Sequence, residues 1–99
     1  MKIAINRRPT HPGAILREDT LPEIGMSQAE FARVLGVSSS TIGELLKERS
    51  RLSVDLAERI GLALGMFPEI WLRLQQAVDL YDSRLKNRSA YQRIEKIAA

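Results

Sequence analysis

The segment MSQAEFARVLGVSSSTIGELL, residues 26–46, decides the fold because it encodes two short helices joined by a single glycine. Ser27 followed by Glu30 predicts a capping box at the start of the first helix. Gly36 is typical of a residue that ends a helix in the left-handed conformation. Two short helices around such a turn indicate a helix-turn-helix, whose second helix enters the major groove of DNA.

The side chains of this segment fit that interpretation. Ala32 is small where the two helices must cross, and Gly36 permits the positive φ of a tight turn. Ile42, with Leu45 and Leu46, is expected to point back into the core. The opposite face of the second helix is polar and narrow, and it carries Ser40, Gly43, Glu44 and Lys47 at helical spacing. Such a face favours close approach to a DNA groove, although serines at a helix start also serve as simple caps.

The rest of the chain predicts three further helices and no strand. They span about residues 10–25, 53–65 and 68–85, with Pro12 and Pro68 at the first helical positions that tolerate proline. Pro22 and Gly25 are expected to end the first of them. The sequence therefore predicts an all-α, compact five-helix domain.

The predicted organisation has three parts: an N-terminal arm over 1–9, a helix-turn-helix domain over 10–82 and a basic C-terminal tail or helix extension over 83–99. Arg7 and Arg8 of the arm either reach DNA or are solvated charges. The tail is basic with occasional apolar residues. It is a partner-binding segment, an extension of the last helix or a solvated end, and the sequence does not decide among these.

Composition excludes several classes of function. The chain has 99 residues, no cysteine and a net charge of +3, which fits one domain without disulfides or thiolate metal sites. Its single histidine, His11, is expected to cap the first helix and not to act in catalysis or metal binding. No apolar run is long enough to cross a membrane. We therefore expect a cytoplasmic protein without cofactor, metal or enzymatic activity.

The candidate DNA-binding residues lie on the second helix of the motif and on both sides of it. Gln28 and Ser38 are expected to hold phosphate, and Ser39, Ser40 and Glu44 to meet base edges. Gly43 is expected to let the helix axis lie close to the sugar-phosphate wall, unless it faces another helix. Electrostatic attraction to DNA is expected from three basic residues after the helix, Lys47, Arg49 and Arg51.

Longer motifs carry a family resemblance. The stretches RPTHPGAILRED, LSVDLAERIGLALG and PEIWLRLQQAVDLYD, together with the segment quoted above, resemble the HigA-type antitoxins of the XRE-like (lambda-repressor-like) helix-turn-helix family. The similarity runs in register from about residue 8 to residue 82. It implies a lambda-repressor-like fold, with residues 38–47 as the recognition helix.

The resemblance also implies partners. Such proteins are homodimers that bind a palindromic operator in double-stranded DNA and neutralise a HigB-type toxin, a RelE-like enzyme that cuts mRNA. Dimer or partner contacts would then come from the last helix and beyond, with Trp71, Val78, Tyr81 and Tyr91 as candidates. Trp71 alternatively fills the core, which we favour. A solitary regulator without a toxin, or a protein-interaction module with a vestigial motif, are the competing interpretations.

Two positions depart from the family pattern. The loop after the recognition helix often carries asparagine and glycine, where this chain has Lys47 and Glu48. A carboxylate there would repel phosphates, so the loop is expected to lie differently. Phe67 replaces the usual Ser or Thr cap before Pro68, and it is expected to compensate by packing or by contacting a partner.

Overall fold

The computed structural model describes residues 7–98, and every regular element within them is helical. The first six residues of the predicted arm, and Ala99, lie outside this range. The elements are α1 (Pro12–Ile15), a π-helical turn η1 (Leu16–Thr20), α2 (Leu21–Ile24), α3 (Gln28–Leu35), α4 (Ser39–Leu46), α5 (Val54–Leu64), α6 (Pro68–Lys86) and α7 (Arg88–Gln92). Because α1, η1 and α2 follow one another directly, the five predicted helices are confirmed and α7 is an addition.

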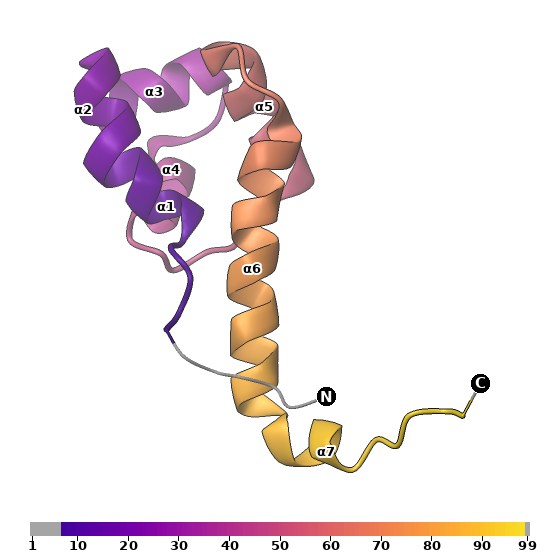
Figure 1. Ribbon diagram of the computed structural model, residues 1–99. Helices are drawn as coiled ribbons and strands as arrows, with labels where there is room; N and C mark the ends of the chain where they lie inside the picture. Colours follow the sequence, from indigo (N-terminus) through magenta and orange to yellow (C-terminus); the bar gives the residue numbers. More distant parts are fainter. Residues whose placement is uncertain (1–6, 99) are drawn as a thin grey trace.

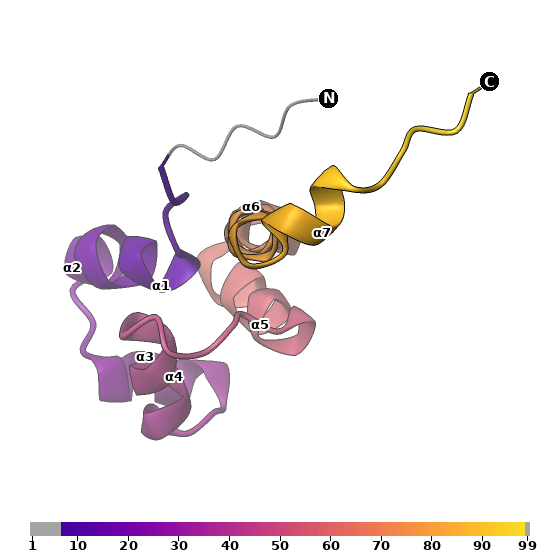
Figure 2. The same ribbon diagram turned by 90° about the horizontal axis from the view of Figure 1, so that it is seen from below.

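The helices divide into a compact head and one projecting helix. Helices α1 to α5 form the head, and α6 runs along one side of it and continues beyond it (Figure 1). Seen along the axis of α6, α7 and the end of the chain lead away from the head (Figure 2). The principal extents of 52 × 25 × 21 Å reflect this projection.

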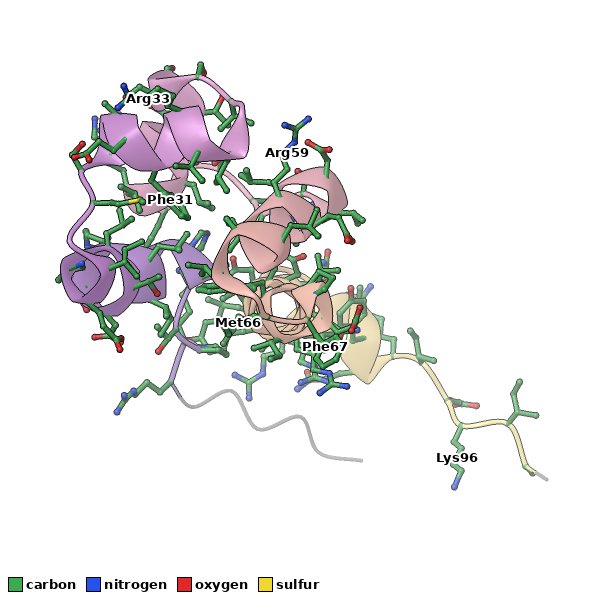
Figure 3. All side chains as sticks on the ribbon, turned by 90° about the horizontal axis from the view of Figure 1, so that it is seen from above. Phe31, Arg33, Arg59, Met66, Phe67 and Lys96 are labelled. Carbon is green, nitrogen blue, oxygen red and sulfur yellow. The ribbon has the colours of Figure 1, made fainter. Side chains whose placement is uncertain are left out.

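The core lies inside the head, where apolar faces of α3, α4, α5 and α6 meet the first helical segment. Phe31 points inward from α3, whereas Arg33 of the same helix points outward (Figure 3). On α4, Ile42 and Leu45 are completely buried, as their spacing predicts. Trp71 of α6, 2% exposed, joins the same cluster and attaches α6 to the head.

The ends of the helices follow from local sequence. The Ser27 Oγ accepts a hydrogen bond from the Glu30 N–H at 3.1 Å, and the Glu30 carboxylate accepts one from the Ser27 N–H at 3.2 Å, so the capping box is confirmed. Gly36 ends α3 with a φ of 73°. The His11 Nδ1 accepts a hydrogen bond from the Gly13 N–H at 2.9 Å, which confirms His11 as the cap of α1.

One expected helix end is half right. Gly25 ends the first helical segment with a φ of 67°, but Pro22 does not interrupt it, because the π-helical turn before Pro22 shifts the backbone hydrogen bonds and accommodates the missing N–H. Residues 83–86 continue α6 to Lys86, so the start of the region after Asp82 is an extension of the last helix, one of the alternatives left open from the sequence. Within residues 7–98, no helix combines the length and apolarity that a membrane crossing requires.

Candidate DNA-binding surface

Helix α4 presents a polar face to solvent. Ser39, Ser40 and Thr41 are exposed, and Glu44 is partly exposed one turn later. The other side of α4 is buried in the head through Ile42 and Leu45. The predicted division of this helix into a core face and an outer polar face is therefore present in the structure.

The N-terminal end of α4 is held by residues close in sequence. The Ser38 Oγ accepts a hydrogen bond from the Thr41 N–H at 3.1 Å and lies 2.8 Å from the Thr41 hydroxyl. The Gln28 side chain crosses from α3 and donates to the Ser39 carbonyl at 2.9 Å. Gln28, Ser38 and Ser39 thus lie together at the start of the recognition helix, where N–H groups and hydroxyls can approach an anion.

The expectation that Gly43 faces the sugar-phosphate wall is wrong. Gly43 is buried, and a methyl group added there would come within 2.7 Å of the Gln28 Nε2. The glycine makes room for the Gln28 side chain that links α3 to α4, so it faces a neighbouring helix. A glycine at this position indicated that another group approaches the helix closely, but helical spacing alone could not identify that group as the Gln28 side chain.

The loop that leaves α4 carries the basic candidates in two different settings. Lys47 and Arg49 are exposed, and Arg49 lies 3.9 Å from the Glu44 carboxylate. Arg51 is instead paired with Asp79 of α6, its Nε being 3.2 Å from both carboxylate oxygens. This guanidinium, with the Gln75 amide, holds the pKa of the Asp79 carboxyl below its usual value. Arg51 therefore fastens the loop to α6, in addition to contributing charge.

Sequence reasoning missed Arg17, which belongs to η1 and lies beside this loop. The Arg17 Nη1 donates to the Leu46 carbonyl at 2.6 Å and lies 3.3 Å from the Glu48 carboxylate. No local pattern predicts a contact across 29 residues. Glu48 is thus paired within the chain.

The residues expected to contact a partner fall into two groups. Trp71 and Val78 are 2% and 1% exposed, so both side chains are buried within this chain. Trp71 fills the core, which is the interpretation favoured from the sequence, whereas the partner contact expected for Val78 is wrong. Tyr81 and Tyr91 are partly exposed, and the Tyr91 hydroxyl lies 2.6 Å from the Ser83 hydroxyl. Phe67 is 74% exposed, so it does not compensate for the lost cap by packing within the chain.

Comparison with known proteins agrees with this geometry. A sequence model of the helix-turn-helix family matches residues 16–72. The antitoxin HigA-1 of Vibrio cholerae serotype O1 is 36% identical over 78 residues, which are 79% of this chain and 73% of that protein. The chain therefore belongs to the helix-turn-helix family. Within that family its relatives include the HigA antitoxins.

Solved structures give the same result. The structure of Pseudomonas aeruginosa antitoxin HigA with the higBA promoter has a TM-score of 0.87 and 34% identity, and the match covers 92% of this chain and 100% of that one. Antitoxin GraA in complex with its operator has a TM-score of 0.88 and 37% identity, covering 99% of this chain and 100% of that one. The predicted lambda-repressor-like fold and the HigA-type resemblance are confirmed.

Proposed function

We propose that this chain is a DNA-binding repressor that acts as a homodimer on an operator upstream of its own gene, and that it neutralises a HigB-type toxin. The observation that carries the proposal is the exposed polar face of α4, held rigidly by the buried Ile42 and Leu45. The similarity to antitoxins solved with promoter or operator DNA supports it.

The structure suggests a role for each part of the surface. Gln28 and Ser38 flank the start of α4 and would contact phosphate, while Ser39, Ser40 and Glu44 would face base edges. Lys47 and Arg49 would contact the backbone beyond the helix. In a two-fold dimer, two such helices would lie about 34 Å apart, one turn of duplex. His11, the only histidine, is buried as a helix cap, and we propose no enzymatic activity.

Fluorescence anisotropy with a labelled duplex from the region upstream of the gene tests DNA binding. The association constant is expected to fall steeply with salt, because phosphate contacts release counterions. A scrambled duplex of the same length serves as the control for specificity. No binding at micromolar protein, or a response that does not depend on salt, would reject the repressor function.

Base readout is tested by E44A with E58A on α5 as the matched control, since both residues are exposed carboxylates on the head. Selection from a randomised duplex library should show a changed preference for E44A at one base position per half-site, and no change for E58A. If E44A strengthens binding equally to all sequences, Glu44 is only an unfavourable charge near phosphate.

The antitoxin function is tested by co-expression with the small RelE-like reading frame next to the gene. Co-purification and relief of growth arrest are expected. If DNA binding is intact and no neighbouring protein is bound or neutralised, the protein is a solitary regulator of the same family.

A further inference from the structure

Two residues beyond the last residue of the recognition helix, the backbone adopts an unusual conformation. Three other helices, α2, α3 and α5, end at Gly25, Gly36 and Gly65 with φ between 67° and 73°. After α4, the residue with positive φ is Glu48, at 60°. Within residues 7–98, Glu48 is the one residue other than glycine that has a positive φ. Because a side chain is disfavoured in this conformation, glutamate at this position needs a reason.

The Glu48 carboxylate lies between two arginines from distant parts of the chain. One oxygen is 3.3 Å from the Arg17 Nη1, and the other is 3.7 Å from the Arg8 Nη1. The same Arg17 nitrogen donates to the carbonyl of Leu46, at the end of α4, where carbonyls have no partner within the helix. Arg17 thus connects the last turn of the recognition helix to Glu48.

Arg8 extends the contact to α6. Its Nε and Nη2 donate to the two carboxylate oxygens of Asp82 at 3.0 and 2.9 Å. This ion pair also holds the pKa of the Asp82 carboxyl below its usual value. Arg17 Nη2 also donates to the Glu18 carboxylate at 3.1 Å. The end of the arm, the exit of α4 and the C-terminal part of α6 are therefore joined by one chain of charges: Asp82, Arg8, Glu48, Arg17 and Glu18.

The position of Glu48 gives this arrangement a consequence for DNA binding. It lies in sequence between Lys47 and Arg49, the two exposed cations that leave the recognition helix. An uncompensated carboxylate there would repel the phosphates that the cations attract. Its partners are no more than half exposed, with 41% for the Arg17 side chain and 43% for Arg8, so both guanidiniums lie against the protein surface.

We propose that Arg17 and Arg8 form a clasp that engages the Glu48 carboxylate and fixes the exit loop, which weakens the repulsion between Glu48 and the phosphates that Lys47 and Arg49 attract. This inference rests on the proposed DNA-binding function. Arg17 and Arg8 act through Glu48 and the loop, and they are positioning residues that need not touch DNA.

The test is a double-mutant cycle with R17M, E48Q and the R17M/E48Q pair, measured as operator affinity by anisotropy. R17M is expected to weaken binding about tenfold, and E48Q in the R17M background to restore it to within about threefold of the wild type. R8Q leaves the Leu46 contact intact, so it replaces R17M in the cycle if R17M does not fold. The operator affinity lost in R8Q should also be restored by E48Q. R73M, an exposed arginine on α6, is the matched control and should leave affinity unchanged.

Two results would overturn the clasp. If E48Q rescues neither R17M nor R8Q, the arginines do not act on DNA binding through Glu48. A second readout needs no DNA: in the free protein, R17M should lower the unfolding temperature less when Glu48 is already glutamine. If R17M lowers the unfolding temperature equally in the wild type and in E48Q, the clasp is overturned even if DNA binding is intact. Failure of the wild type to bind DNA rejects the proposed function, whereas this coupling tests the clasp independently.

Discussion

The two ends of the recognition helix α4 are held by different means. At its N-terminal end, Gly36 makes the turn and Gln28 of the preceding helix donates to the Ser39 carbonyl. At its C-terminal end, Gly13 of α1 packs against the Leu45 carbonyl, and Arg17 donates to the carbonyl of Leu46. The start is held by Gly36, by Gln28 from 11 residues earlier and by the contact of Arg59 with the Leu35 carbonyl, whereas a segment about 30 residues earlier holds the end.

This difference shows where the motif depends on the rest of the domain. A cap and a glycine set the start of α4 through bonds that span a few residues, so this part forms from local preferences. Its exit direction is fixed only once the first helical segment has docked. The C-terminal end should therefore be the more sensitive of the two to a small change in a distant residue.

The largest effect is expected from adding one methyl group at the C-terminal contact. In G13A the new Cβ would lie 1.8 Å from the Leu45 carbonyl oxygen, so the backbone of α1 or α4 must move. We expect a loss of about 3 kcal/mol or more in the free energy of unfolding, measured by urea denaturation.

The matched change is G43A, in the middle of α4, at the contact with the Gln28 side chain that holds the start of the helix. Its new Cβ would meet only the flexible end of the Gln28 side chain, at 2.7 Å, and alanine favours the helix. The free energy of unfolding should change by less than about 1 kcal/mol. Similar losses for G13A and G43A would contradict the difference between the two ends.

G36V tests how much the turn at the start of α4 contributes to stability. Valine at a φ of 73° is strained, and its Cβ would lie 3.2 Å from the Arg59 guanidinium, which donates to the Leu35 carbonyl at 2.8 Å. We expect a loss of about 2 kcal/mol in thermal or chemical unfolding. The control is G65V, where φ is 67° and no atom lies within 4 Å of the added Cβ. If G65V costs as much as G36V, the Arg59 contact adds nothing to the turn.

His11 caps α1, the helix that packs on the C-terminal end of α4. This cap should make the free energy of unfolding depend on pH. Burial lowers the pKa of the His11 imidazole, and the Glu48 charge only partly opposes this. Since the unfolded chain binds this proton at a higher pH than the folded chain does, the free energy of unfolding should fall as the pH decreases below about 7. The slope is at most about 1.4 kcal/mol per pH unit for one proton.

The control for this prediction is H11N, because asparagine is a good helix cap that does not titrate. Its unfolding free energy should be flat over the same range, since the lowered pKa values of Asp79 and Asp82 place their protonation at more acidic pH. The same decline in H11N as in the wild type would show that His11 is not its source.

The smallest expected effect is a gain in stability. E48G places glycine where φ is 60°, which should raise the free energy of unfolding by about 0.5–1 kcal/mol, although the ion pairs with Arg17 and Arg8 are lost. Differential scanning calorimetry would register a higher melting temperature. A lower one would mean that these pairs contribute more to stability than backbone strain costs.

The sequence predicted the head of the molecule and the start of α4 because their determinants are local. Ser27, Ser38 and Gly36 act within a few residues, and the spacing of apolar residues marks the core. The role of Gly43 and the exit at Glu48 were not predictable, since both depend on a side chain from another helix. Val78 was misassigned because helical spacing does not say what covers an apolar face, although its distance of seven residues from the buried Trp71 places both on one side of α6.

The most direct measurement of the central claim, that the surface of α4 and its exit loop faces DNA, is the salt dependence of operator affinity in K47Q. Neutralising Lys47 should reduce the slope of log K against log[salt] by about 1, because one phosphate contact is lost. R73Q on α6 should leave the slope unchanged. An unchanged slope in K47Q, or an equal reduction in R73Q, would show that DNA lies elsewhere on the protein.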